Sequence, residues 1–455
     1  MTRLGCLLLF AATTLHAGTT LQPTPFETHS PGYVVTSPAG TVVEEEGASL
    51  TLSAQEKPKQ FGTATAHADA TPAILQRVTL SGELRTTAVA GGASLWLRVD
   101  GGKRMFVLDN GVQNALRGDA DWTKRSITLP VPPNATQVVF GVLLQAGGGA
   151  VDVRHLRLTT SPLPTTLPSP AAAKLLDEAI GIVRANALHT KDVDWSARVP
   201  EIRALAAGAE QTSDVYGAIK YLLLILDDGH SFFMPPAQTT ANAKGGADNP
   251  MPEVASKNDV VSIAMPGYSG TDPTAARLYA LRMFKALEQS APAARCGWIV
   301  DLRNDGGGNM YPMLNGLKPF LGDDRLGFFV TSSQKVPWVT RGLVPPPLPL
   351  MKLRTASVAV ITGPHTASSG EIVAIAFRGR PHVRSFGHPT AGLTTANRAF
   401  PLSDGSSLAL AVSIDADRTG HVYGGKLDPD EVVDDATVLD VASKWLHESS
   451  GCDAH

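Results

Sequence analysis

The sequence has few cysteines, no excess charge of one sign and no long uninterrupted apolar run. Its three cysteines are too few for a disulfide-rich scaffold or for a zinc site with four thiolates. With 39 basic and 42 acidic residues the net charge is −3, and no basic stripe indicates binding to nucleic acid or to an anionic membrane. After the N-terminal segment, no stretch reaches the roughly 18 apolar residues of a membrane-spanning helix.

The composition is that of a folded, turn-rich protein. Hydrophobic residues make up 43% and charged residues 18% of the chain, which indicates a globular rather than a disordered protein. The 43 glycines and 33 prolines favour many turns and an appreciable β content. A chain of 455 residues is long enough for two or three domains, each with its own core.

Residues 1–17 have the pattern of a secretory signal peptide. Arg3 is followed by an apolar run from Leu4 to Leu15, and Ala17 is the small residue after which we expect cleavage. The alternative is a buried N-terminal helix or strand, which would also be apolar. We favour the signal peptide, because the run is too short to span a bilayer. We therefore expect an exported protein, periplasmic or extracellular.

Export would leave two cysteines, Cys296 and Cys452, in an oxidising compartment where they could pair. Cys296, however, starts an apolar strand, and a buried free thiol is common at such a position. The sequence therefore favours a buried thiol over a disulfide.

The period of the apolar residues divides the rest of the chain into domains. Within residues 18–160, short alternating segments separated by Gly, Asp, Asn and Pro predict an all-β sandwich. The expected strands are 78–84, 94–100, 104–108, 126–129, 137–144 and 151–158. Residues 161–171 are rich in proline and predict a stiff linker, and so a domain boundary.

After the linker the pattern becomes helical and then mixed. Apolar spacing predicts helices at 173–187 and 218–226, so residues 172–235 are expected to be a helical lead-in. In residues 236–455 strands alternate with helices, with buried strands at 297–302 and 357–362 and a helix at 371–377. We therefore expect a multidomain protein that ends in an α/β core.

Three separate segments contain the residue types that serine hydrolysis needs. His230 lies in a Gly-containing turn after a helix, a Gly-rich segment runs from Asp301 to Asn309, and Thr366–Glu371 is a small-residue turn between a strand and a helix. A serine at such a turn is exposed, and the helix N-terminus offers N–H groups to an oxyanion. Glycines let backbone N–H groups approach a substrate, and a histidine can serve as the base. Taken singly, an N-cap serine, a Gly turn or a structural histidine is the more common explanation.

In this order the three segments resemble the S41 family of serine peptidases, which includes the tail-specific, C-terminal-processing and tricorn-core proteases. The resemblance covers roughly residues 172–455. It implies that Ser368 is the nucleophile and that Glu371 is the glutamate of the Thr-Ala-Ser-x-x-Glu motif. It places the oxyanion hole at the backbone of Gly307 or Gly308 and of Ser369. It implies a peptide or protein substrate and neither a metal nor an organic cofactor.

The chain departs from the family pattern at the base. Many members use a lysine where this sequence has Leu393, which excludes a Ser–Lys dyad in its usual place. A histidine is then the expected base, and His230 is favoured over His388 and over His365, which lies too close to the serine in sequence. Asp417 is the candidate for the acid that orients the base.

The N-terminal and central regions carry two further expectations. The interval 233–296 is too short for the PDZ domain of processing proteases, so capture of substrate tails by such a domain is not expected. The sandwich resembles the galactose-binding-type jelly roll that precedes some bacterial S41 domains, on Leu95–Asp100, Asp109–Asn110 and Asp121–Trp122. Trp96 and Trp122 could stack on a sugar, although core positions are more common for such aromatics. A glycan or a protein is the expected ligand of this domain.

Together these features predict an exported serine endopeptidase of the tail-specific type. Ser368 would attack a peptide carbonyl, and water would resolve the acyl-enzyme. Two alternatives stay open. The chain could be a catalytically inactive S41-type fold that binds a partner, or an esterase or amidase that uses the same serine. Neither a nucleic-acid partner nor a membrane span is expected.

Overall fold

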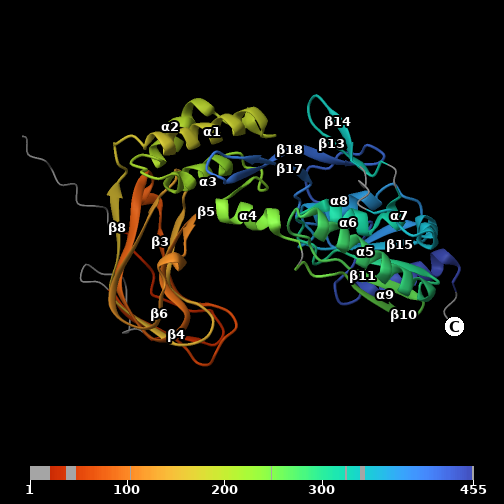
Figure 1. Cartoon of the computed structure of the whole chain (residues 1–455), viewed down its shortest axis with the longest axis horizontal. Helices are drawn as coiled ribbons and strands as arrows, with labels where there is room; N and C mark the ends of the chain where they lie inside the picture. The colour runs from red at the N-terminus through yellow and green to blue at the C-terminus, as the bar shows by residue number, and fades with distance from the viewer. Residues whose placement is uncertain are drawn as a thin grey trace, which may run out of the picture. The chain divides into compact units, whose positions relative to one another are not determined.

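The computed structural model describes residues 21–36, 48–102, 104–246, 248–322, 325–338 and 344–452. The expected signal peptide, residues 1–17, lies outside them. The chain divides into two compact units (Figure 1). One holds the chain up to Leu176 together with Asp194–Leu222, and the other holds Asp177–Val193 together with the chain from Leu223 onward. Each unit has its own core and is described by itself.

The first unit contains the expected all-β sandwich. Its strands are β1 (Tyr33–Thr36), β2 (Ala48–Ala54), β3 (Gly62–Asp69), β4 (Gln76–Gly101), β5 (Arg104–Asp109), β6 (Leu116–Pro130), β7 (Gln137–Leu144) and β8 (Ala150–Pro162). They pair antiparallel in the order β1-β2-β8-β4-β7-β3, and β5 and β6 also pair with β4. Two single-turn 3₁₀ helices, η1 (Thr71–Ala73) and η2 (Val112–Asn114), connect strands. Every second side chain of a strand points into the interior of the sandwich. In β3 these are Ala64, Ala66 and Ala68, which are buried between more exposed neighbours.

Strand β4 joins two segments that the sequence predicted as separate strands, 78–84 and 94–100. The strand runs over 26 residues, with register shifts between Leu84 and Ala93 and a positive φ of 52° at Ala88. Such bulges bend a strand sharply. The first half of β4 therefore pairs with β8, and the second half pairs with β7 and β5.

The predicted helices of the lead-in are present as α1 (Pro170–Asn186) and α3 (Tyr216–Leu224), with α2 (Trp195–Leu205) between them. Short 3₁₀ helices, η3 (Thr190–Asp192) and η4 (Thr212–Val215), precede α2 and α3. The segment expected to be a linker, 161–171, is in contact with the residues after α2. Gly208 N–H donates to Thr166 O and Ser169 N–H donates to Ala209 O, both at 2.8 Å. It is therefore not a free spacer.

The second unit is built on a six-stranded sheet in the order β10-β11-β12-β15-β16-β19. These strands are β10 (Glu253–Lys257), β11 (Val260–Ala264), β12 (Gly297–Asp301), β15 (Val358–Thr362), β16 (Val383–Gly387) and β19 (Glu431–Val432), and all but β10 run parallel. The helices of this unit are α4 (Pro236–Lys244), α5 (Pro273–Ser290), α6 (Met310–Gly316), α7 (Lys318–Leu321), α8 (Ser369–Phe377) and α9 (Val438–Ser450), with η5 (Ala291–Ala293) and η6 (Leu348–Thr355).

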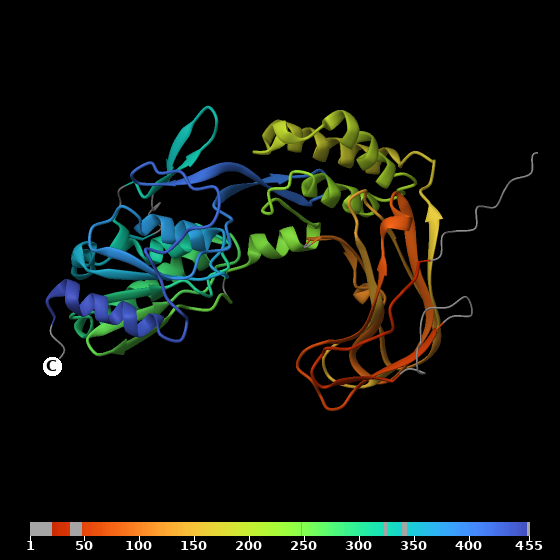
Figure 2. The same cartoon turned by 180° about the vertical axis from the view of Figure 1, so that it is seen from behind.

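The sheet is covered on both faces, as the predicted α/β core requires. One core cluster combines Val261, Val300 and Val360 with side chains of α5, α6 and α8. A second cluster combines Ile299 and Ile361 with side chains of α9. Helix α9 is the C-terminal helix in both views (Figure 2).

A second, antiparallel sheet of this unit has the order β14-β13-β18-β17, and β9 also pairs with β18. Its strands are β9 (Phe232–Met234), β13 (Gly327–Val330), β14 (Lys335–Trp338), β17 (Thr395–Pro401) and β18 (Ser407–Asp417). Strand β9 begins two residues after His230, so its pairing with β18 fixes the histidine turn beside this sheet. None of the helices in the described ranges is long and apolar enough to cross a membrane.

The two remaining cysteines form a disulfide, Cys296–Cys452, with a Cα–Cα distance of 5.4 Å. The preference for a free thiol was wrong. Cys296 directly precedes β12 and Cys452 follows α9, and Leu446 of α9 packs in the same core cluster as Ile299 of β12. Packing of the helix on the strand thus brings two residues 156 positions apart within bridging distance.

Candidate active site

Ser368 occupies a strained turn between β15 and α8. Its backbone has φ 53° and ψ −117°, a conformation that residues other than glycine rarely adopt. Contacts on both sides hold the turn: Thr366 Oγ1 donates to Leu302 O at 2.8 Å, and Ala367 N–H donates to Asp305 O at 3.0 Å. A sharp strand-to-helix turn of this kind presents a serine hydroxyl outward from the sheet.

His230 is the group that contacts this hydroxyl. Its Nε2 lies 2.8 Å from Ser368 Oγ, although the two residues are 138 positions apart. Asp228 Oδ1 accepts from the N–H groups of His230 and Ser231, which fixes the turn. Only 8% of His230 is exposed, and this burial lowers its pKa, with the charge of Asp228 acting in the opposite direction. A neutral imidazole is therefore favoured near neutral pH.

The other imidazole nitrogen, Nδ1, lies 2.7 Å from Thr395 Oγ1 at the start of β17. If Nε2 accepts the serine proton, Nδ1 carries the proton of the neutral ring and donates it to the threonine hydroxyl. Asn397 Nδ2 donates to His230 O at 2.9 Å, so β17 contacts both the ring and the backbone of the histidine. No sequence pattern pointed to Thr395.

Asp417, the expected orienting acid, is occupied in its own turn. It accepts from Thr419, Gly420 and His421 N–H groups through Oδ1, and Tyr423 Oη donates to Oδ2 at 2.8 Å. Partial burial acts to raise the pKa of Asp417, but these hydrogen bonds outweigh it and lower the pKa. Within the described part of the chain, the side-chain contact at His230 Nδ1 is Thr395 and not a carboxylate.

The other serine and the other histidines near this site do not form the contact between base and nucleophile. Ser369 Oγ donates to Gly308 O at 2.6 Å, so this hydroxyl fastens the glycine loop to α8. His388 contacts Thr362 through backbone and hydroxyl groups. His365 is exposed. Of the residues described, it is His230 that the structure brings to Ser368.

The glycine loop lies directly against the serine turn. A Cβ on Gly307, whose φ is +96°, would lie 2.9 Å from Ser368 Cβ and 3.0 Å from Ser369 N. Only glycine fits this approach. The Gly307 N–H donates to Asp305 Oδ1 at 3.0 Å. Asp305 is fully buried, and burial raises its pKa to about 7.

Glu371 organises the site from inside the protein, a role that the sequence analysis left unassigned. Its buried carboxylate accepts four hydrogen bonds, from Ser368 N, Thr390 Oγ1, Gly392 N and Leu393 N. Burial raises the pKa of Glu371, and the four donors act in the opposite direction. The Ser-x-x-Glu spacing at a helix start could have indicated part of this role, because it is the pattern of a capping box.

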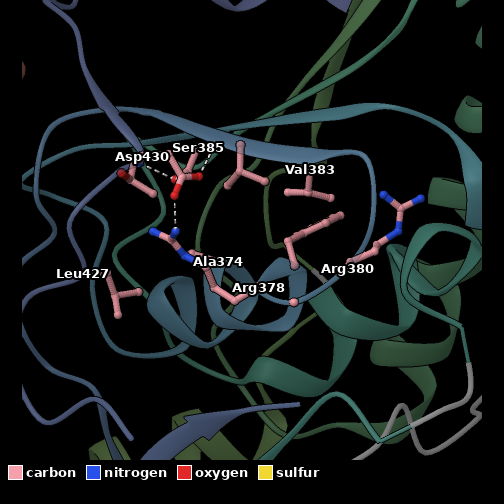
Figure 3. Close-up of a pocket in the computed structure, with 11 residues that line it drawn as sticks. Ala374, Arg378, Arg380, Val383, Ser385, Leu427 and Asp430 are labelled. Atoms are coloured by element: carbon pink, nitrogen blue, oxygen red, sulfur yellow. Dashed lines mark hydrogen bonds and ion pairs between the residues drawn. The ribbon is translucent and has the colours of Figure 1, made fainter. Parts of the chain in front are cut away.

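A small cavity of about 150 Å³ lies at the other end of α8 (Figure 3). Asp430 accepts from Ser385 N–H and Oγ and from Arg378 Nη1, and these contacts tie the segment around Asp430 to β16 and α8. Nine residues of helix place this cavity about 13 Å along the axis from the serine turn. We attribute a structural role to these residues.

One group of possible metal ligands occurs among the described residues, formed by Cys296, His447 and Cys452. Both of its sulfurs are engaged in the disulfide, and a thiolate rather than a disulfide sulfur binds metals. His447 Nδ1 instead contacts Cys452 O at 3.0 Å. The group is therefore part of the bridge that holds α9.

Residues 262–433 match the model of peptidase family S41. This range contains the glycine loop, Ser368 and Glu371. Residues 262–433 belong to peptidase family S41. His230 lies N-terminal to the matched range.

Individual relatives extend the similarity beyond this range. The nisin-resistance protein of Lactococcus lactis subsp. lactis is 26% identical over 265 residues, which cover 56% of this chain and 81% of that protein. The uncharacterized HTH-type transcriptional regulator YbfP of Bacillus subtilis (strain 168) is 32% identical over 146 residues, 31% of this chain and 44% of that protein. The solved structure of a lipoprotein from Streptococcus agalactiae is 26% identical, with a TM-score of 0.53, and the match covers 63% of this chain and all of that one.

Proposed function

We propose that the chain is an exported serine-type endopeptidase in which Ser368 is the nucleophile and His230 the general base. The observation that carries the proposal is the 2.8 Å contact between His230 Nε2 and Ser368 Oγ. A nucleophile within hydrogen-bond reach of a base, which is itself held by a third group, is the arrangement that serine hydrolysis requires. The S41 match supports a peptide bond as the target.

Proton transfer follows from the environment of the histidine. Burial lowers the pKa of His230, which keeps the imidazole neutral and able to accept a proton near pH 7. As Ser368 Oγ attacks the substrate carbonyl, Nε2 takes the hydroxyl proton, and Thr395 Oγ1 holds the Nδ1–H side of the ring. His230 then gives the proton to the leaving amine. In the second half, water attacks the acyl-enzyme with the same base.

The oxyanion would lie at the N-terminus of α8, between the helix and the glycine loop. We assign one donor to the Ser369 N–H in the first turn of α8 and the other to the loop, at Gly307 or Gly308. If Gly307 is the donor from the loop, its N–H must share or leave its hydrogen bond to Asp305 Oδ1. The bond from Ser369 Oγ to Gly308 O would keep the loop at the required distance.

Export is proposed on two grounds. The first is the signal-peptide pattern of residues 1–17. The second is the Cys296–Cys452 disulfide, because structural disulfides persist in periplasmic and extracellular compartments and are rare in the cytosol.

The test is labelling of the full-length protein with a fluorophosphonate, combined with hydrolysis of casein, short peptides and p-nitrophenyl esters. Nisin joins the panel because a relative is named for resistance to it. Ser368→Ala and His230→Ala should each lose labelling and hydrolysis, whereas Ser449→Ala on α9 should keep both. Labelling that persists in Ser368→Ala would refute the assignment. Ester cleavage without peptide cleavage would favour the esterase alternative, and a folded protein that does neither would favour the binding alternative.

A further inference from the structure

The disulfide at the end of α9 gathers three side chains that could bind a metal once the bridge is open. Cys296 directly precedes β12, Cys452 follows α9, and His447 lies in the last turn of that helix. Their possible ligand atoms all lie within 4.8 Å of one another. The imidazole is directed at the bridge, since its Nδ1 lies 3.3 Å from Cys296 Sγ and 3.0 Å from Cys452 O. In the oxidised protein Nδ1–H therefore donates to the carbonyl of Cys452.

Packing holds this arrangement together with the covalent bond. Leu446, one residue before the histidine, is fully buried in a cluster with Ile299 of β12. A Cβ on Gly297 would lie 2.7 Å from Leu446 Cδ2, so the glycine at the start of β12 lets the helix approach the strand closely. Cys452 N–H donates to His447 O at 3.1 Å, which keeps the residue beyond the helix against its last turn. The three side chains should therefore stay together after the S–S bond is broken.

The donor set determines which metal the site would take. Two thiolates and an imidazole suit zinc, whereas Mg²⁺ and Ca²⁺ prefer oxygen ligands. Because Zn–S bonds are about 2.3 Å long, the two sulfurs must separate to share one ion. Cys452 lies beyond the C-cap Gly451, outside the helix, so its side chain can make this movement. Cys296 is buried, but His447 and Cys452 are partly exposed, so an ion can reach the site from solvent.

We propose that the reduced protein binds Zn²⁺ through Cys296, Cys452 and His447, so that the same side chains form either a disulfide or a metal centre. A dithiol reductant supplies two electrons and two protons: the S–S bond breaks, two thiols form, and the reductant becomes a disulfide. Zn²⁺ then replaces both thiol protons, which pass to solvent. Nδ1 of His447 becomes a ligand, and Nε2 carries the proton of the neutral ring. Water takes the fourth tetrahedral position.

The bridge is the stable form in an oxidising compartment, so the metal form belongs to reducing conditions. There the ion would take over the role of the bridge in holding α9. The helix packs on β12 and β15, which lead to the glycine loop and to Ser368. An ion that binds the folded chain more tightly than the unfolded chain stabilises the fold. Zn²⁺ should therefore restore part of the thermal stability that reduction removes.

Zinc binding by the full-length protein before and after reduction tests the proposal. The reductant is a phosphine, which is oxidised to its phosphine oxide with an oxygen from water, and the excess is removed in the absence of air. Titration with Zn²⁺ against a chromophoric chelator should show one more bound ion per chain in the reduced protein than in the oxidised protein. Co²⁺ in place of Zn²⁺ should give a thiolate-to-metal charge-transfer band. Zn²⁺ should raise the Tm of the reduced protein and leave that of the oxidised protein unchanged.

His447→Ala should weaken Zn²⁺ binding by the reduced protein about a hundredfold or more, because even groups that only orient a ligand are worth about 10–100-fold. This variant keeps both cysteines, so its bridge can still form before reduction. The matched controls are Cys6→Ser, in the expected signal peptide, and His29→Ala, an exposed histidine of the first unit. Both should bind as wild type.

Three results would each overturn the proposal. The reduced protein could bind no more Zn²⁺ than the oxidised protein, or give no charge-transfer band with Co²⁺. His447→Ala could bind as tightly as wild type, which would mean that the imidazole is not a ligand. Cys6→Ser or His29→Ala could lose the additional ion, which would place it elsewhere in the chain.

Discussion

Replacement of Glu371 by glutamine tests whether one buried carboxylate holds the catalytic turn. Oε2 accepts from the N–H groups of Ser368 and Leu393, both at 2.8 Å, and Oε1 accepts from Thr390 Oγ1 and from Gly392 N–H at 2.9 Å. All four partners are therefore donors. Glutamine keeps the size of the side chain but offers only one acceptor oxygen, and its NH₂ group must face two of these donors.

The magnitude follows from the two lost bonds. Hydrogen bonds to a charged group are worth about 1.5–3 kcal/mol each, so Glu371→Gln should lower the free energy of unfolding of the second unit by about 3–6 kcal/mol. The serine turn should also shift, since Ser368 N–H itself is one of the groups that the carboxylate holds. A misplacement of about 1 Å at a nucleophile costs about a hundredfold in rate. We expect that loss in kcat, with a smaller change in KM.

Urea unfolding and peptide kinetics of the full-length variant measure both effects. The matched control is Glu448→Gln, the same chemical change at an exposed position of α9 where the carboxylate lies 3.9 Å from Lys444 Nζ. An exposed pair of this kind is worth about 0.5 kcal/mol or less. If Glu371→Gln unfolds at the same urea concentration as wild type and keeps its kcat, the carboxylate does not hold the turn and the reasoning fails.

Four further outcomes are expected. Thr395→Val removes the hydroxyl at the imidazole and should lower kcat/KM by up to about tenfold, the worth of one neutral hydrogen bond; unchanged kinetics would deny it an orienting role. Because burial lowers the pKa of His230, kcat/KM should fall only below the ordinary histidine value of about 6.5, and a pH–rate profile with a higher inflection would contradict this. Gly307→Ala should abolish peptide hydrolysis, whereas Gly306→Ala, where a Cβ meets nothing within 4 Å, should not; equal activities would argue against the close approach of the loop. Cys452→Ser opens a bridge across 156 positions and should lower stability by up to about 5 kcal/mol, visible as a lower Tm under non-reducing conditions; an unchanged Tm would mean that the bridge does not form in solution.

The parts of the fold that the sequence predicted are those with a strong local signal. Strands β12 and β15 are continuous apolar runs because both of their faces are buried, and α8 begins where the apolar run of β15 ends in small residues. The sequence could not show that two of the predicted strands are one strand, β4. A bulge within a strand and a turn between strands both place small residues between apolar runs, so the two look alike in sequence. The disulfide was missed for a related reason. It depends on α9 packing on β12, a tertiary contact that the spacing of the cysteines does not contain.

In the site, too, residues with a local sequence signal could be predicted, and residues whose part depends on a tertiary contact could not. Ser368, the glycine loop and His230 lie in segments whose residue order is recognisable, and the structure brings the serine and the histidine together. Thr395 carries no such signal, because a threonine at the start of a strand is ordinary and its role arises from a contact across 165 positions. Asp417 was chosen as an acid in a suitable stretch of sequence. Its turn contains five hydrogen-bond donors close in sequence, and these satisfy the carboxylate locally.

In the proposed mechanism, the segment with Leu393 has a different part from the lysine segment of many S41 peptidases. Its backbone is still fixed by Glu371, through the N–H groups of Gly392 and Leu393, so the loop keeps its place beside the serine turn. The leucine side chain cannot take a proton. Two residues further on, however, Thr395 reaches the imidazole of His230. In the proposed mechanism the loop therefore no longer supplies the base but supports it. In that mechanism His230 takes the part of the lysine, and the pairing of β9 with β18 fixes the turn that brings it to Ser368.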